Sequence, residues 1–94
     1  MDLRVEYLDP FYDSLWLLDN SPKTFRALVV LLSDATKEPE TVPRLKGTNM
    51  RVAMTTPDSG LVLLRVFFFI EDGVMKIMEV EPYEEWEFYA TNSN

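Results

Sequence analysis

The first half of the chain shows one strand-like pattern followed by two helical patterns. Residues 3–8 place apolar side chains mainly at every second position, a period of two that predicts a half-buried strand. Residues 10–18 and 22–37 instead repeat apolar side chains every three to four positions, as amphipathic helices do. Asp9-Pro10 and Ser21-Pro22 each predict a capping residue followed by proline at the first helical position. We expect the two helices to form a hairpin.

The second half of the chain is typical of antiparallel strands. Residues 49–55 alternate, residues 61–71 are almost continuously apolar, and residues 74–81 form a third strand-like run. The continuous run predicts a central strand that is covered on both faces. Asp72-Gly73 lies between two such runs and predicts a two-residue hairpin turn with both residues at positive φ. The acidic and aromatic segment 83–89 predicts either an edge segment or a short helix.

The predicted order β-α-α-β-β-β describes an α+β fold in which a helical hairpin packs on a small antiparallel sheet. Ninety-four residues leave room for a single core, so we expect one domain over 1–94, with 90–94 as a frayed tail. In the second helix, the stripe that faces this core is expected to be Phe25, Leu28, Val29 and Leu32.

The unbroken apolar stretches, such as residues 66–70, are too short to cross a bilayer. The N-terminus also lacks the basic start and apolar run of a targeting segment. We therefore expect no membrane partner and a cytoplasmic location, which the absence of cysteine fits.

The composition excludes several kinds of chemistry. The chain has no histidine and no cysteine, which excludes Ser-His and Cys-His nucleophilic mechanisms and cysteine-based metal sites. Its formal net charge is −7, and residues 71–94 alone carry a net charge of −6. Such an acidic surface repels nucleic-acid phosphates and favours basic partners, or it simply keeps the protein soluble.

Arg65 interrupts the most apolar run of the chain. Because a buried cation is costly unless it is paired, one interpretation is a structural ion pair with Glu79 or another strand neighbour. In the other interpretation, Arg65 is the floor of a concave anion site with Lys46 and Arg51, able to stabilise charge at a scissile phosphate. Glu79 and Glu81 share a strand face and could bind Mg²⁺, but so small a sheet offers little room for a substrate. We expect neither a metal nor a cofactor.

Four stretches carry a family resemblance, over roughly residues 3–81. They are Leu3–Tyr7 with Phe11 and Leu15, the loop Arg44–Thr48, the strand Leu64–Ile70 and the turn Asp72–Val74. The loop is similar to an LKG motif and the strand to a YRVFF motif. Together these stretches resemble the RelE/ParE superfamily of bacterial toxins, including its HigB-type, phage-related branch. The resemblance implies a RelE-like fold and a toxin–antitoxin setting.

The resemblance also implies an activity and a site. RelE- and HigB-type toxins are mRNA interferases that cleave messenger RNA at the ribosome, ParE-type toxins poison DNA gyrase, and a cognate antitoxin inhibits both. By the same resemblance, Lys46 matches the loop lysine, Arg51 the basic position of the second strand, Arg65 the arginine of the third strand and Tyr83 the C-terminal aromatic. These four residues are the candidate catalytic residues of an endoribonuclease whose partners would be ribosome and mRNA.

Residues 79–87 depart from the family pattern, because carboxylates stand where a basic segment would meet RNA. At about 5 Å and an effective dielectric of about 20, each charge reversal changes the interaction with a phosphate by several kcal/mol. The departure therefore leaves the expectation of a RelE-like fold in place and argues against full nuclease activity.

The sequence thus leaves three hypotheses open: a RelE-like endoribonuclease, a protein-binding module with a toxin fold, and a phage-related inhibitor that mimics nucleic acid. The second would act through aromatic side chains of the acidic C-terminal segment, since such side chains anchor interfaces. They are Tyr83, Trp86, Phe88 and Tyr89. Alternatively, Trp86 and Phe88 simply cover one sheet face. Trp16 is expected either at the rim of the core or in a dimer contact.

Overall fold

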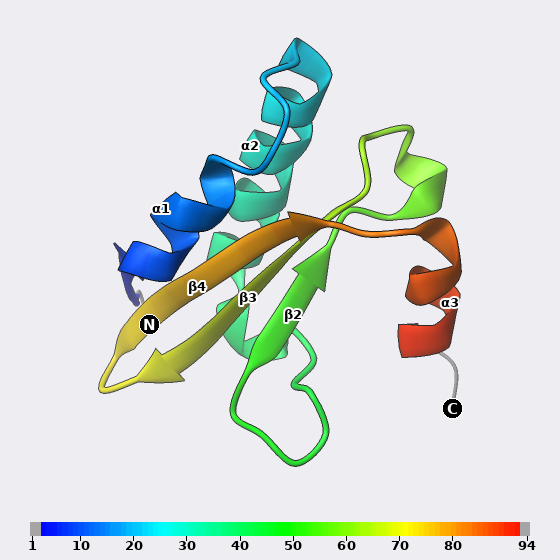
Figure 1. The fold of residues 1–94 in the computed structure, drawn as a ribbon. Helices are drawn as coiled ribbons and strands as arrows, with labels where there is room; N and C mark the ends of the chain where they lie inside the picture. The colour runs from blue at the N-terminus through cyan, green and yellow to red at the C-terminus, as the bar shows by residue number, and fades with distance from the viewer. Residues whose placement is uncertain (1–2, 93–94) are drawn as a thin grey trace.

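Two helices pack on a four-stranded sheet, and a third helix follows the last strand (Figure 1). The computed structural model describes residues 3–92. The elements in chain order are β1 (Arg4–Tyr7), α1 (Asp9–Leu15), α2 (Pro22–Lys37), β2 (Arg51–Met54), β3 (Leu64–Glu71), β4 (Val74–Pro82) and α3 (Glu85–Asn92). Two 3₁₀ turns, Pro39–Thr41 and Pro57–Ser59, lie in the loops on either side of β2. The α+β class and the predicted order of the first six elements are confirmed.

The sheet is mixed, with strand order β1-β4-β3-β2. The strands β2, β3 and β4 pair antiparallel, as expected, and Asp72-Gly73 forms the predicted hairpin turn with φ values of 52° and 75°. The expectation of a wholly antiparallel sheet is wrong for β1, which runs parallel to β4. No hairpin joins these two strands, and the long connection through the rest of the chain permits a parallel pair.

The core lies between the helices and one face of the sheet. Its members from β3 and β4 are completely or almost completely buried: Leu64, Val66, Phe68, Met75, Ile77 and Val80. The hydroxyl of Ser14 joins α1 to this sheet, because it donates to the Phe11 carbonyl at 2.7 Å and accepts the Val80 N–H at 3.1 Å. The expected coverage of β3 on both faces is wrong, since its other face, with Arg65 and Phe67, is only half-buried.

The helix α2 presents a different stripe to the core from the one expected. Its buried residues are Thr24, Ala27, Leu31 and Ala35, whereas Phe25 is 67% exposed and Val29 49% exposed. Leu28 and Leu32 pack partly against the core. The small side chains of Ala27 and Ala35 allow the helix to approach the sheet closely, and this close approach sets its rotation.

The two helix starts differ. Ser21 caps α2 as predicted, since its Oγ accepts the N–H of Thr24 at 3.1 Å. The predicted cap by Asp9 is wrong, because Leu8 occupies the capping position of α1 without a side-chain hydrogen bond, and Asp9 is the first helical residue.

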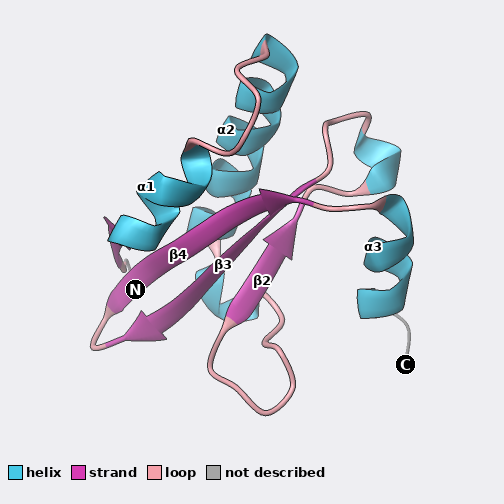
Figure 2. Cartoon of the chain, in the orientation of Figure 1, coloured by secondary structure: helices cyan, strands magenta, loops and turns pink. Residues whose placement is uncertain are grey.

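The segment after β4 is helical, which settles the choice between an edge segment and a short helix. The helix α3 lies beyond β2, apart from α1 and α2 (Figure 2). Of the tail that we expected to fray, residues 90–92 belong to α3, and 93–94 lie outside the described residues.

Candidate functional site

The face of the sheet opposite α1 and α2 carries Arg65, one of the four candidate residues; we call it the open face. On β3 it presents Arg65 and Phe67, because side chains alternate along a strand. The strand register places Met54 and Glu81 on either side of Arg65. A guanidinium therefore lies near the middle of a sheet face between apolar and acidic neighbours.

Arg65 is held by two carboxylates and two aromatic rings. Its Nη2 lies 3.1 Å from Oε2 of Glu81, and its Nη1 lies 2.7 Å from Oε2 of Glu87 on α3. The guanidinium carbon is 5.7 Å from the centre of the Phe67 ring and 5.9 Å from that of Tyr83. The side chain is only 22% exposed. The interpretation of Arg65 as a structural ion pair with a strand neighbour is confirmed. The neighbour is Glu81, whereas Glu79, the partner named from the sequence, lies opposite Phe67.

The hydroxyl of Tyr83 is also engaged within the protein. It donates a hydrogen bond to the backbone carbonyl of Thr55, and the tyrosine is buried. Burial raises the pKa of the Tyr83 phenol above its ordinary value, and the positive charge of Arg65 opposes part of that rise. The phenol is thus a protonated donor that joins the end of β4 to the end of β2.

Arg51 lies on the other face of the sheet. It pairs with Phe68 in the register, on the helix-covered side. Its Nη1 donates to the backbone carbonyls of Glu40, at 3.1 Å, and Val42, at 2.7 Å. Because both bonds go to the loop after α2, Arg51 anchors that loop and does not face Arg65.

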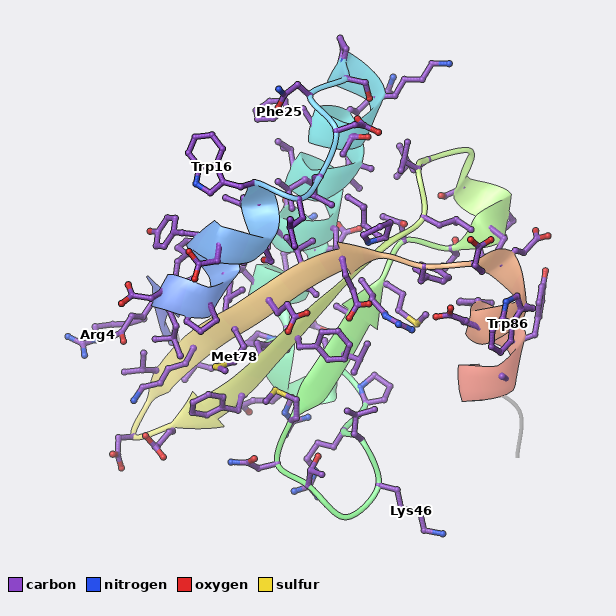
Figure 3. The ribbon with its side chains drawn as sticks, in the orientation of Figure 1. Arg4, Trp16, Phe25, Lys46, Met78 and Trp86 are labelled. Carbon is purple, nitrogen blue, oxygen red and sulfur yellow. The ribbon has the colours of Figure 1, made fainter. Side chains whose placement is uncertain are left out.

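Lys46 lies in an exposed loop before β2, and Figure 3 shows its side chain pointing away from the body of the protein. The structure therefore brings together Arg65 and Tyr83 of the four candidate catalytic residues. It does not assemble the concave anion site expected from Arg65, Lys46 and Arg51.

A groove of about 850 Å³ runs along the β2 edge of the sheet, between α2 and the loop 41–46. Its apolar lining includes Val30, Leu31, Val42, Val52, Leu61 and Phe88. Sequence reasoning missed this groove because its walls come from segments that are far apart in the chain. No local pattern marks it.

The helix α3 exposes an acidic–aromatic surface, which we define as Glu84, Glu85, Trp86 and Tyr89. Trp86 is 67% exposed and Tyr89 59% exposed, and Figure 3 shows Trp86 on the outside of the helix. The alternative that Trp86 covers a sheet face is wrong, because the segment is helical and turns this side chain outward. Phe88 is half-buried and lines the groove.

Neither a metal site nor a membrane span is found within residues 3–92. No three acidic side chains of this part of the chain are grouped to hold a metal ion. None of its helices is long and apolar enough to cross a membrane.

Comparison with known proteins supports the fold. No protein-family model matches the sequence, and no curated protein matches it either. Among solved structures, the toxin–antitoxin complex RelBE2 from Mycobacterium tuberculosis contains a chain that matches with a TM-score of 0.63 and 18% sequence identity. The match covers 88% of this chain and 100% of that chain. The expected fold is confirmed, and the protein has a RelE-like α+β fold.

Proposed function

We propose that this chain is a RelE-like toxin-family protein that acts by binding other proteins and does not cleave messenger RNA. The observation that carries the proposal is the double ion pair of Arg65 with Glu81 and Glu87. Arg65, the cation that lies beside Tyr83 on the open face, is already neutralised within the chain.

The local charge supports this proposal. One guanidinium between two carboxylates leaves a net charge of −1 at the position where a scissile phosphate would need a cation. A phosphate charge about 5 Å from an unbalanced carboxylate is repelled by about 3 kcal/mol at an effective dielectric of 20. Binding of RNA would first have to break ion pairs that are already short and well placed.

The other candidate catalytic residues add little to such a site. The Tyr83 hydroxyl is occupied by a backbone carbonyl, Arg51 anchors a loop on the far face, and Lys46 points into solvent. A nuclease needs its cations and its acid–base groups to converge on one phosphate.

The partner that we infer is a cognate antitoxin or another protein with a basic contact surface, in the cytoplasm. The matched structure is that of a toxin–antitoxin complex, which supports an antitoxin partner. The acidic–aromatic surface of α3 fits a basic contact surface, with Trp86 and Tyr89 as apolar anchors. Placement in the HigB-type, phage-related branch rests on the four sequence stretches alone.

The activity part of the proposal is tested by expressing the full chain in a bacterial host and assaying messenger cleavage on programmed ribosomes. We expect neither growth arrest nor cleavage from the wild type, and the same from Arg65→Ala. A RelE toxin of known activity serves as the positive control. Growth arrest by the wild type that Arg65→Ala relieves would overturn the proposal.

A charge-neutral variant makes this test sharper. Glu81→Gln combined with Glu87→Gln keeps the shape of both side chains and removes both negative charges from Arg65. We expect this variant to remain without cleavage. If it cleaved messenger RNA, the chain would be a masked nuclease, contrary to the proposal.

The binding part is tested by pull-down from lysate of the source cells. Trp86→Ala with Tyr89→Ala should release a captured protein, and raised salt should release it as well. Phe25→Ala, which removes an equally exposed aromatic side chain from α2, is the matched control and should retain the captured protein. Equal retention by all variants would exclude α3 as the contact.

A further inference from the structure

The strand β1 is an exposed edge of the sheet. It pairs on one side with β4, and no further strand of residues 3–92 lies on its other side. All four residues of β1 are exposed, including Val5 at 41% and Tyr7 at 36%. Sheet edges are commonly protected by short length, charged side chains, proline or a bulge. The strand β1 is short and carries Arg4 and Glu6, but it has no proline and its register with β4 is regular, so its backbone groups stay available for pairing.

The backbone groups that β1 turns outward follow from its pairing with β4. The N–H groups of Arg4 and Leu8 donate to the carbonyls of Gly73 and Ile77, at 3.2 and 3.0 Å. Alternate residues of a parallel strand face the same neighbour. Leu3, Val5 and Tyr7 therefore direct their N–H and C=O groups away from β4, toward the free edge.

We propose that this edge pairs with β1 of a second copy of the chain, antiparallel and about a two-fold axis that passes beside Val5. In this register Val5 lies opposite Val5 of the partner subunit, and Leu3 lies opposite Tyr7 of the partner subunit. Each of these residues is one whose backbone groups point outward. The pairing therefore satisfies the free groups of both edges and makes one continuous sheet through the dimer.

Charge complementarity selects a second copy as the occupant. The same register places Arg4 opposite Glu6 of the partner subunit, and the two-fold axis repeats this pair. Neither residue forms an ion pair within residues 3–92, and Figure 3 shows Arg4 projecting away from the protein at this edge. Directly opposed charges of opposite sign stabilise antiparallel pairs, and like charges destabilise them.

Exposed aromatic side chains extend this contact from β1 onto α1. The ring centres of Tyr7 and Tyr12 are 6.5 Å apart, and Trp16 follows Tyr12 by one helical turn. Tyr12 is 51% exposed and Trp16 87% exposed. A two-fold axis perpendicular to the sheet places α1 of both copies on the same face of the continuous sheet. These large side chains can then supply the apolar area that a short strand pair lacks.

The test is sedimentation equilibrium of the full chain over a wide concentration range, with charge variants at the edge. We expect a dimer whose dissociation constant rises at least tenfold in Arg4→Glu and in Glu6→Arg, because each creates two like-charge pairs. The double variant Arg4→Glu/Glu6→Arg restores opposite charges and should restore wild-type association. Circular dichroism checks that each variant is folded.

A cysteine probe reports the register directly, since the chain has no native cysteine. Opposed residues of a hydrogen-bonded antiparallel pair have Cα atoms about 5.5 Å apart, within the range that a disulfide spans. Val5→Cys should therefore cross-link two copies under mild oxidation. Ser33→Cys, on the exposed side of α2, is the control and should not cross-link under the same conditions.

Three results would overturn the proposal. The first is a wild type that is monomeric at every concentration, whether or not it binds a strand of another protein at this edge. Another is a dimer that both single charge reversals leave intact. The third is a double variant that associates as weakly as the single ones. Because α3 is not part of this contact, a failure here leaves the test of the acidic–aromatic surface unaffected.

Discussion

The two faces of β3 share one strand and differ in almost everything else. Leu64, Val66 and Phe68 face the helices and are completely buried. Arg65 and Phe67 alternate with them on the open face and are half-buried. Because the side-chain period of a strand is two, a single continuous apolar run encodes both a core face and a face that holds a charged group.

The two faces therefore contribute differently to the stability of the fold and to its binding chemistry. Burial of apolar area contributes about 25 cal/mol per Å², so the helix-covered face stabilises the fold. Ion pairs near the surface contribute much less, because the loss of hydration offsets most of the attraction. Changes of charge on the open face are therefore expected to cost little stability.

The largest expected effect tests the contrast between the faces directly. Phe68→Ala should lower the free energy of unfolding by about 3–5 kcal/mol, since it leaves a cavity in a fully buried site. Phe67→Ala, the adjacent aromatic on the open face, should lower it by about 1 kcal/mol. Urea denaturation of both variants measures the difference. Equal losses would mean that the open face is as well packed as the core.

A smaller loss of stability is expected at Tyr83, which lies just beyond the end of β4. Tyr83→Phe removes the donor to the Thr55 carbonyl and should lower the free energy of unfolding by about 1–2 kcal/mol. The raised pKa means that the folded state favours the neutral phenol. This stabilisation is present below the unfolded pKa of about 10 and is lost as the pH rises through the folded pKa.

The pH dependence provides the check. Above pH 10 the stability of the wild type should fall more steeply than that of Tyr83→Phe, in urea titrations at several pH values. Tyr12→Phe, at an exposed tyrosine, is the control and should follow the wild type. Parallel curves for the wild type and Tyr83→Phe would contradict the assignment.

The smallest effect on stability is expected for the ion pair between Arg65 and Glu87. A double-mutant cycle between Arg65→Met and Glu87→Gln should give a coupling energy of about 1 kcal/mol, because the contact is short but near the surface. Thermal unfolding of the four proteins measures this coupling. A coupling above about 3 kcal/mol would show that the open face contributes to stability on the scale of a core contact.

Local patterns predicted the parts of the fold that depend on neighbouring residues. The Asp72-Gly73 turn and the cap at Ser21 were both found, because each is decided by a few backbone groups close in sequence. The rotation of α2 was not predicted, since Phe25 and Ala27 lie on nearly opposite sides of the helix and only packing against the sheet chooses between them.

The candidate site was predicted in part. The unusual position of Arg65 in an apolar run indicated an ion pair with a strand neighbour, but the sequence named Glu79, and the register decides for Glu81. Its second partner, Glu87, could not be identified, because the segment was consistent with either a helix or an edge segment. The separation of Arg51 from Arg65 required the register of β2, which depends on pairing with β3.

The sequence by itself determined the α+β class, the antiparallel hairpins and the acidic character of the C-terminal region. These follow from periodicity, turn chemistry and charge, which act over short stretches of chain. Only the tertiary structure decided that β1 runs parallel at a free edge, that a groove lines β2 and that Arg65 is neutralised by α3. Each of these depends on contacts between segments distant in sequence, whose geometry is set by how the helices and strands pack together.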